Sequence, residues 1–247
     1  MTWVLVTVAK SAGSVPRVAG TQMRVFADHI DGTIGGGALE WAAMQHARKM
    51  IADGVDNDRQ TVPLGPALGQ CCGGSVTLDY ARDAATDSGA ARDIWVYGAG
   101  HVGRALITVL AGLPDVRITW VDTDMARFPA QMPDNVHPFA ASDPARAATH
   151  APDTAEHLIL TYSHTIDLAI CHALLARPVR SIGLIGSATK WARFKTRLAT
   201  LGHAAAAIAR IACPIGDPRL GKHPAEIAIG VGVAMIACDS ATKDKTA

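Results

Sequence analysis

Two adjacent cysteines enclosed by glycines are the most unusual chemical feature of the sequence. Cys71 and Cys72 stand in the run Gly69-Gln70-Cys71-Cys72-Gly73-Gly74, which we expect to form a loop just before a strand. Thiolates suit soft metal centres, and glycines let a bulky ligand approach the main chain. A free cysteine also fills apolar cores, but two such fillers beside glycines are less expected. We therefore predict a ligand-binding thiol here and take residues 70–74 as candidate binding residues.

A glycine loop in the second half of the chain has the spacing of a dinucleotide-binding turn. Gly98-Ala99-Gly100-His101-Val102-Gly103 directly follows an apolar stretch and opens a predicted helix. The first glycine permits the tight turn, the second lets the backbone approach a pyrophosphate, and the third lets helix and strand pack closely. Asp122 ends the next predicted strand, where such folds place a carboxylate for a ribose. This indicates NAD rather than NADP, although the same glycines also form this turn where no nucleotide binds.

Weaker candidates for anion binding lie elsewhere in the chain. An arginine grips a phosphate through two hydrogen bonds, and amides before a helix attract anions. Arg17 and the triple glycine Gly35-Gly36-Gly37 are therefore candidates for phosphate contact, with a solvated arginine and a plain turn as the alternatives. The turn Gly186-Ser187-Ala188-Thr189-Lys190 also joins a strand to a helix, but it lacks the spacing of a P-loop. We expect a capped helix there.

Two polar residues follow a predicted strand where doubly wound sheets place ligands. His164 and Asp167 would serve there as a proton donor or an orienting pair, and a histidine at a helix start is the simpler alternative. Because no nucleophile stands near them in the sequence, we assign no catalytic residue. The other three cysteines lie in apolar settings and are expected to pack: Cys171, Cys213 and Cys238.

The cysteine usage limits the kinds of metal site. The chain holds five cysteines, an odd number, and has neither a CxxC pair nor an HExxH motif. We therefore expect reduced thiols and no structural zinc site. Cys71 and Cys72 are the only metal ligands that we predict.

A small sheet and a helix would position the candidates of the first 80 residues. Alternating patterns predict strands at residues 3–9, 21–26 and 75–80, with a turn at residues 31–32. Residues 38–52 place Leu39, Ala43 and Ala47 on one helical stripe. We expect an N-terminal α+β domain over residues 1–80, followed by a linker of small and polar residues at 81–92.

From residue 93 the pattern changes to strands that alternate with helices, which is typical of a parallel sheet. We expect a Rossmann-like doubly wound domain over residues 93–240 and a disordered tail at 241–247. The fold class is therefore α/β, with a small α+β domain in front. The predicted strands are residues 94–97, 116–121, 158–162 and 181–185, and the predicted helices are residues 102–113, 166–176, 190–201 and 224–238.

The composition is that of an ordinary globular protein. Of 247 residues, 49% are hydrophobic and 18% charged, enough for one large core or two small ones. A net charge of +1 excludes a broad attraction to nucleic acid or anionic membrane. The longest apolar stretch, residues 227–238, is shorter than the about 20 residues of a membrane span, and the first residues do not look like an export signal. We expect a cytoplasmic protein.

Taken together, these segments resemble the XdhC/CoxI family of accessory proteins for molybdenum hydroxylases. Seven ordered segments are far more specific than the glycine loop alone. Thr189 and Tyr162 depart from the family pattern. In chain order, over about residues 4–216, the segments are VTVAKSAGSVPRVAGTQM, GTIGGGALE, LGPALGQCCGG, VYGAGHVGRAL, TYSHTIDLAIC, GLIGSATKWARF and CPIG.

The resemblance implies a maturation role in place of catalysis. Such a protein, often a homodimer, would bind molybdenum cofactor, protect it until sulfur replaces an oxo ligand, and deliver it to the apo-enzyme. Its partners would be the molybdenum-binding subunit of xanthine dehydrogenase and a NifS-type cysteine desulfurase. The resemblance also implies that Cys71 or Cys72 contacts the molybdenum–dithiolene group, and that Arg17 and the triple glycine are candidates for the pterin and its phosphate.

Other functions fit parts of the same sequence. An NAD-dependent oxidoreductase would use the Gly98 loop for dinucleotide and His101 or His164 as an acid, but it leaves the thiol loop unused. A redox sensor or sulfur relay would use Cys71 and Cys72 by thiol exchange. The sequence leaves open whether the Gly98 loop holds NAD(P), a cofactor phosphate or nothing.

Overall fold

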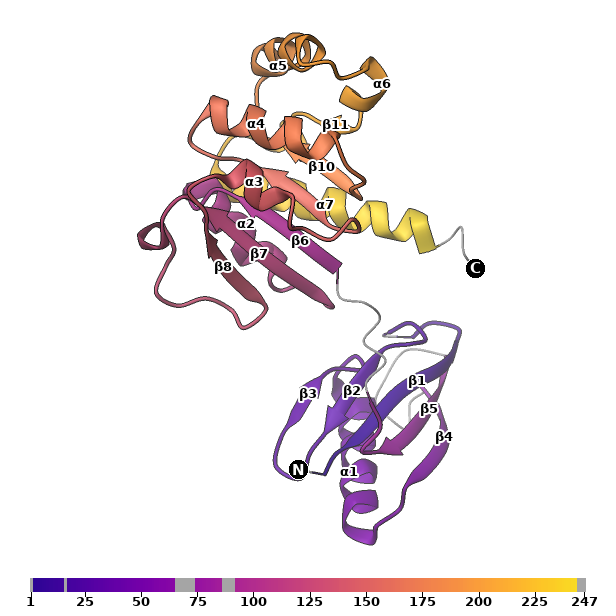
Figure 1. Cartoon of the computed structure of the whole chain (residues 1–247). Coiled ribbons are helices and arrows are strands. Elements are labelled where there is room, and N and C mark those ends of the chain that lie inside the picture. The colour runs from indigo at the N-terminus through magenta and orange to yellow at the C-terminus, as the bar shows by residue number, and fades with distance from the viewer. Residues whose placement is uncertain (1, 16, 65–73, 86–91, 244–247) are drawn as a thin grey trace. The chain divides into compact units, whose positions relative to one another are not determined.

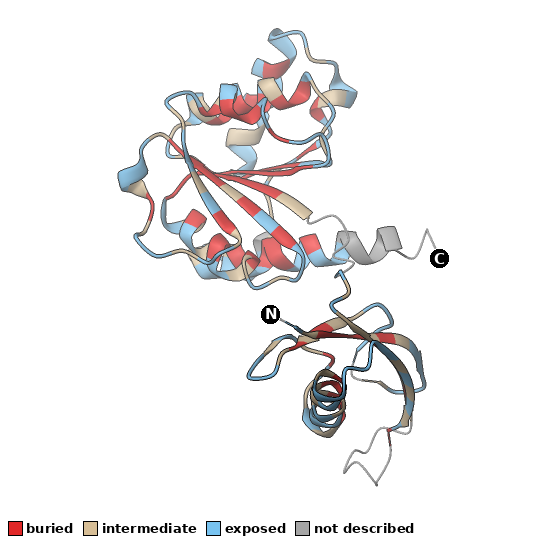
Figure 2. Cartoon of the chain, turned by 60° about the horizontal axis from the view of Figure 1, so that its bottom comes forward, coloured by how far each residue is buried: buried red, intermediate tan, exposed pale blue. Residues whose placement is uncertain are grey.

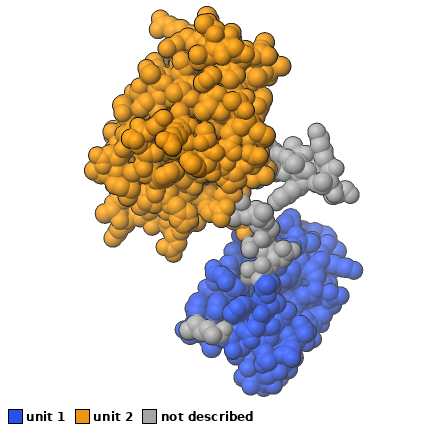
Figure 3. All heavy atoms as spheres, viewed as in Figure 1, with its two compact units in different colours: residues 1–87 blue, residues 88–247 orange. Residues whose placement is uncertain are grey.

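The chain folds into two compact units. A computed structural model describes all residues except 1, 16, 65–73, 86–91 and 244–247. The units are Met1–Asp87 and Ser88–Ala247 (Figure 3). The division falls within the expected linker at 81–92, but β5 runs to Arg82 and β6 begins at Arg92, so both ends of that segment belong to strands.

The described residues of the first unit form an antiparallel sheet with one helix, and the strand order is β3-β2-β1-β5-β4 (Figure 1). Alternate residues of the central strand, Val4, Val6 and Val8, enter a core that α1 covers. Figure 2 shows the buried stripe of α1 facing the sheet. The elements are β1 (Val4–Ala12), β2 (Gln22–Val25), β3 (Ile30–Gly32), α1 (Gly37–Asp53), β4 (Asn57–Pro63) and β5 (Ser75–Arg82).

The expected strands and helix of this unit are present with small shifts at their ends. Two edge strands were not predicted. β3 stands where we expected only a turn, and β4 has no fully buried residue in its sequence NDRQTVP. An exposed edge strand lacks the apolar alternation that reveals a half-buried one.

The second unit is a six-stranded parallel sheet in the order β11-β10-β9-β6-β7-β8. Numbered within the unit, this order is 6-5-4-1-2-3, the doubly wound arrangement in which the strand order reverses between β6 and β9. The predicted Rossmann-like class is therefore confirmed. The strands are β6 (Arg92–Tyr97), β7 (Val116–Asp122), β8 (Val136–Ala140), β9 (Glu156–Ile159), β10 (Ser181–Leu184) and β11 (Ile211–Ala212).

Helices cover both faces of this sheet, and each face has its own core. On one face Leu106 and Leu110 of α2 meet Ala228 and Val231 of α7. On the other face α3, α4, α5 and α6 enclose the second core. The helices are α2 (His101–Leu110), α3 (Pro144–Ala148), α4 (His164–Leu175), α5 (Ala188–Thr200), α6 (Ala205–Ile208) and α7 (Pro224–Lys243), with 3-10 turns η2 (Met125–Arg127) and η3 (Pro218–Leu220).

Helix α7 extends further than the sequence indicated. We expected it to end at residue 238 and the tail at 241–247 to be disordered, but the helix runs to Lys243. The prediction is therefore wrong for residues 241–243, and residues 244–247 lie outside the described part. In the described part of the chain, no helix has the length and apolarity that a membrane crossing requires.

Candidate functional site

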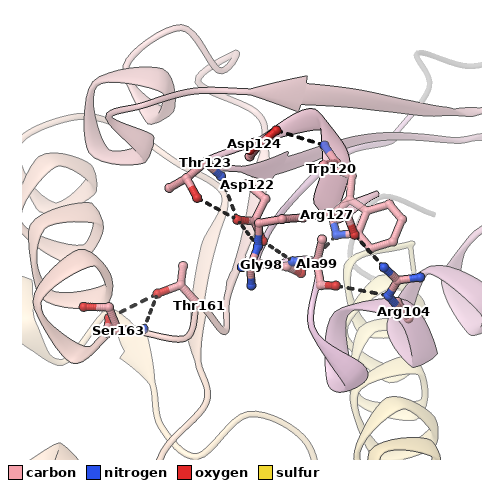
Figure 4. Close-up of polar contacts among 11 residues, drawn as sticks. Gly98, Ala99, Arg104, Trp120, Asp122, Thr123, Asp124, Arg127, Thr161 and Ser163 are labelled. Carbon is pink, nitrogen blue, oxygen red and sulfur yellow. Dashed lines mark hydrogen bonds and ion pairs between the residues drawn. The ribbon is translucent and has the colours of Figure 1, made fainter. Parts of the chain in front are cut away.

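The segments that follow three neighbouring strands meet at the carboxyl edge of the parallel sheet (Figure 4). Gly98 follows β6, Asp122 ends β7, and Thr161 comes soon after β9. The Gly98 amide donates to the Val121 carbonyl at 2.8 Å. Because the strand order reverses between β6 and β9, this edge is where doubly wound sheets bind ligands.

A side chain is excluded at two glycines of the Gly98 loop for different reasons, and at the third there is open space. Gly98 has a φ of +117°, and a Cβ on it would lie 2.5 Å from the Leu160 carbonyl oxygen. A Cβ on Gly103 would collide with the carbonyl oxygen of Gly98, so this glycine lets α2 pack against β6. A Cβ on Gly100 would meet no atom within 4 Å. The space at Gly100 is therefore open, at the position through which such loops approach a pyrophosphate.

Helix α2 begins at this loop without a side-chain cap. Its N-cap residue, Gly100, has no side chain to accept from the first amides, and the first turn contains no acidic residue. The amides at a helix start carry partial positive charge and bind anions. His101, the first helical residue, is exposed beside them.

Asp122 is turned into the loop as a support. Its Oδ2 accepts from the Ala99 amide at 2.6 Å, and its Oδ1 accepts from the Thr123 amide at 2.7 Å. Burial raises the pKa of Asp122, but these amides and Arg127 outweigh burial and hold the pKa below its usual range. The side chain is only 3% exposed. We expected this carboxylate to meet a ribose, and the structure instead commits both oxygens to the chain.

Two arginines stand beside the loop. Nε of Arg127 lies 2.7 Å from Oδ1 of Asp122, and its guanidinium carbon lies 4.8 Å from the ring centre of Tyr162. Arg104 donates from Nε to the Ala99 carbonyl at 3.2 Å and from Nη2 to the Arg127 carbonyl at 2.5 Å. An open hollow of about 540 Å³ lies here, lined by Ala99, Gly100, His101, Arg104 and Arg127. The arrangement can hold an anion.

The segment after β9 is held by a buried ion pair. Asp167 is fully buried, accepts from the Thr161 amide and hydroxyl at 3.0 and 2.7 Å, and lies 2.6 Å from Nζ of Lys190. Nζ of Lys190 also donates to the Ile185 carbonyl at 2.8 Å. Asp167 is thus a positioning residue of the sheet edge. His164 starts α4 behind its cap, Ser163, and packs edge-on to Phe194.

The Gly186 turn forms a capped helix start, as expected. The Ser187 side chain accepts from the Lys190 amide at 3.2 Å. Because the Lys190 ammonium faces Asp167, it is directed into the protein. Nearby, burial raises the pKa of the Cys171 thiol to about 12 and also raises that of Cys213, as expected of packing residues. The side chain of Cys238 is not among those described.

In the first unit, an internal carboxylate occupies the triple-glycine segment. Oε2 of Glu40 accepts from the amides of Ile34 and Gly36 at 3.0 and 3.1 Å, and the Gly35 amide donates to the Thr33 hydroxyl at 3.1 Å. The expectation of free amides at Gly35 and Gly36 is therefore wrong, because the Thr33 hydroxyl accepts from the first and the Glu40 carboxylate of α1 accepts from the second. Gly37 is the first residue of α1.

The stem of the cysteine loop is described, but the loop itself is not. Gln70, Cys71, Cys72 and Gly73 lie outside the described residues. The amide of Leu64 donates to the Gly74 carbonyl at 2.8 Å, so the two ends of the segment meet. A Cβ on Gly74 would lie 2.5 and 2.6 Å from the carbonyl oxygens of Ala12 and Ser14. The stem is therefore packed against the segment that leads to Arg17, which is exposed.

Comparison with known families covers both units. The XdhC Rossmann domain matches residues 94–234, and the XdhC and CoxI family matches residues 1–62. The chain belongs to the XdhC/CoxI family. The resemblance seen in the sequence is thus confirmed.

One protein is similar to this XdhC/CoxI chain in sequence, and one solved structure is similar to it in fold. It is 26% identical over 234 residues to the uncharacterized protein YqeB of Escherichia coli K12, matching 93% of this chain and 42% of that protein. The chain therefore spans less than half the length of that relative. A crystal structure described as a xanthine dehydrogenase from Bacillus halodurans has the same fold, with a TM-score of 0.76, 16% identity, and coverage of 96% of this chain and 91% of that one.

Sequence reasoning missed Arg104 and Arg127. Arg104 directly follows the last glycine of the loop, and Arg127 follows Asp122 by one short turn. Their proximity to the loop would have been the signal. The described residues contain no group of three or more metal-ligating side chains, and the predicted ligands Cys71 and Cys72 lie outside them.

Proposed function

We propose that this chain binds molybdenum cofactor, protects it while sulfur replaces an oxo ligand, and delivers it to apo-xanthine dehydrogenase. The observation that carries the proposal is the match of both units to XdhC/CoxI domains, at residues 1–62 and 94–234. The proposed partners are the molybdenum-binding subunit and a NifS-type cysteine desulfurase, and the proposed setting is a cytoplasmic homodimer. The cofactor supplies hydroxylation chemistry only once it is in xanthine dehydrogenase. Catalysis therefore belongs to that enzyme, and the proposed role of this chain is that of a carrier.

The described residues fit the phosphate end of this cofactor. The hollow beside Gly100 has guanidinium groups from Arg104 and Arg127 and the uncapped start of α2. Each can donate charge-assisted or dipole-aligned hydrogen bonds to phosphate oxygens. The triple glycine is a poorer candidate, because the Glu40 carboxylate already accepts from the Gly36 amide and repels an anion.

In the first unit, the segment with Cys71 and Cys72 is a separate candidate for contact with the molybdenum–dithiolene group. Thiolates are soft ligands, so they suit contact with the soft, sulfur-bound metal of a molybdenum–dithiolene group. The packed stem at Leu64 and Gly74 fixes where the cysteine segment leaves the sheet, beside the carbonyls of Ala12 and Ser14.

Retention of the pterin tests the proposal. Cofactor released from a molybdenum enzyme is added anaerobically, the protein is desalted, and bound pterin is oxidised and measured by fluorescence. We expect near-stoichiometric pterin on the wild-type protein, loss of most of it in Cys71→Ala/Cys72→Ala, and retention in the control Cys213→Ala, which changes a half-buried cysteine of the second unit. Wild-type protein without pterin would refute the carrier role.

A second candidate, an NAD(P)-dependent oxidoreductase, is favoured by the sheet order and the Gly98 loop. Against it, Asp122 is committed to the chain, and Asp167 is buried against Lys190. The test is turnover: an oxidoreductase reduces a hydride acceptor with saturable dependence on dinucleotide, and a carrier does not.

A further inference from the structure

The chemistry of the hollow beside Gly100 differs from that of a site for an unmodified ribose. A ribose in a doubly wound fold donates its hydroxyls to the carboxylate that ends the second strand. Here that carboxylate is Asp122, which accepts from two backbone amides and pairs with Arg127. With 3% of its side chain exposed, Asp122 presents almost no surface to a ligand.

The same place presents cations. Arg127 pairs with the buried Asp122 and keeps 39% of its own side chain exposed. Arg104 is fixed by two carbonyl oxygens, so its remaining N–H groups are oriented before a ligand arrives. The other carboxylate of this turn, Asp124, is committed to the Ala126 amide. The residues that line the hollow include Arg104 and Arg127 but neither carboxylate, so its lining carries a net positive charge.

We infer that this hollow binds a phosphomonoester dianion in preference to a ribose diol. A phosphomonoester has three terminal oxygens, which match the forked donors of guanidinium groups. The open face of Gly100 and the uncapped start of α2 allow close approach of those oxygens. The sequence alone indicated NAD, and the structure points to the phosphate-bearing alternative.

Two sources carry this group. One is the terminal phosphate of the pterin cofactor, in which case the inference rests on the proposed function and deepens it. The other is the 2′-phosphate of NADP(H), in which case it goes beyond that function. Both share the phosphomonoester, and the arms of the experiment separate them.

Binding is measured by calorimetry on the full chain with two matched pairs of probes. The first pair is NADP⁺ and NAD⁺, which differ by one phosphomonoester. The second pair is oxidised, metal-free pterin derived from the cofactor, with its terminal phosphate and after phosphatase treatment. Within at least one pair we expect the phosphorylated member to bind about tenfold or more tightly.

Variants locate the effect. Arg104→Gln and Arg127→Gln should each remove about tenfold of the preference, while Arg117→Gln should not. Arg117 is the matched control, because it is ion-paired to Asp93 on the same sheet. Arg127→Gln leaves buried Asp122 without its ion-pair partner and so could unfold the protein. Arg104 donates only to carbonyl oxygens, so Arg104→Gln keeps the test valid if Arg127→Gln unfolds.

The outcomes are distinct. Preference in the first pair assigns the site to NADP(H), and preference in the second assigns it to the pterin phosphate. Equal affinity within both pairs, absence of binding by all four probes, or a preference unchanged in Arg104→Gln would overturn the inference. Because the cysteine variants test pterin retention separately, failure here leaves the carrier proposal to stand or fall on its own measurement.

Discussion

Asp122 and Arg127 form an ion pair at the carboxyl end of β7, with Nε 2.7 Å from Oδ1, and the same carboxylate accepts the Ala99 amide of the glycine loop. One side chain thus joins the loop after β6 to the turn after β7. The pair also affects the charge of the hollow, because the Asp122 carboxylate is buried and the Arg127 guanidinium stays partly exposed to solvent.

Asp122→Asn should destabilise the second unit by about 1–3 kcal/mol. Asparagine offers one acceptor oxygen, so one of the Ala99 and Thr123 amides would face an N–H group, and Arg127 would lose its counterion. The measurement is urea unfolding followed by tryptophan fluorescence, to which buried Trp120 contributes. The control Asp134→Asn, at an exposed site, should change stability by less than about 0.5 kcal/mol.

The effect of Asp122→Asn should depend on pH. The pKa of Asp122 is lowered in the folded protein, so its contribution is complete above the unfolded-state pKa of about 3.9 and is lost as the pH falls through the lower folded value. The stability difference between wild type and variant should therefore shrink below about pH 4. A difference that stays constant from pH 6 to pH 3 would contradict this account.

The glycines of the loop should respond differently to alanine. Gly103→Ala brings a Cβ into the Gly98 carbonyl oxygen and should cost about 3 kcal/mol or more. Gly100→Ala meets open space, so it should cost about 1 kcal/mol or less while weakening phosphate binding. Thermal unfolding and calorimetry measure the two effects. Similar destabilisation by both variants would show that the space at Gly100 is not open.

Local patterns were enough to predict the central elements of both units. The Gly98 turn, the strand before it and helix α2 are encoded within adjacent residues, so sequence spacing revealed them. β4 and β8 escaped prediction because they are edge strands, and β8 buries only Val136. Their place in the sheet comes from pairing with a neighbour and not from their own apolar pattern.

The roles of charged residues were harder to predict, because they depend on distant partners. Asp122 has the position of a ribose ligand, but its orientation depends on Arg127 and the Ala99 amide. Lys190 ends the turn where we expected a capped helix, and the partner of its ammonium, Asp167, lies 23 residues away in the sequence. Glu40 likewise closes the turn that its own helix follows. Each case is a competition between an internal partner and an external ligand, which sequence spacing does not settle.

Lys190→Met should destabilise the second unit by about 3–5 kcal/mol, because it leaves a fully buried carboxylate without its counterion. The double variant Asp167→Asn/Lys190→Met should recover about half of that loss, since asparagine still accepts from the Thr161 amide and hydroxyl. Urea unfolding of the two variants and of exposed Lys195→Met measures this. A double variant less stable than the single one would contradict the ion-pair account.

His157 should make the second unit less stable in mild acid. It is fully buried, its Nδ1 lies 2.9 Å from the Tyr97 hydroxyl, and burial, with a smaller effect of Arg177, lowers its pKa to about 4. In the unfolded chain a histidine titrates near pH 6.5. As the pH falls from 7 to 5, the unfolded state therefore takes up a proton that the folded state does not, and roughly 2 kcal/mol of stability is lost.

The variant His157→Gln isolates this effect, because glutamine keeps a polar group near Tyr97 and does not titrate. Its stability should fall by roughly 2 kcal/mol less than that of the wild type between pH 7 and pH 5. Exposed His137→Gln should lose as much as the wild type. Equal losses in His157→Gln and wild type would mean that His157 is protonated in the folded protein, and that the contact with Tyr97 rearranges to admit the charge.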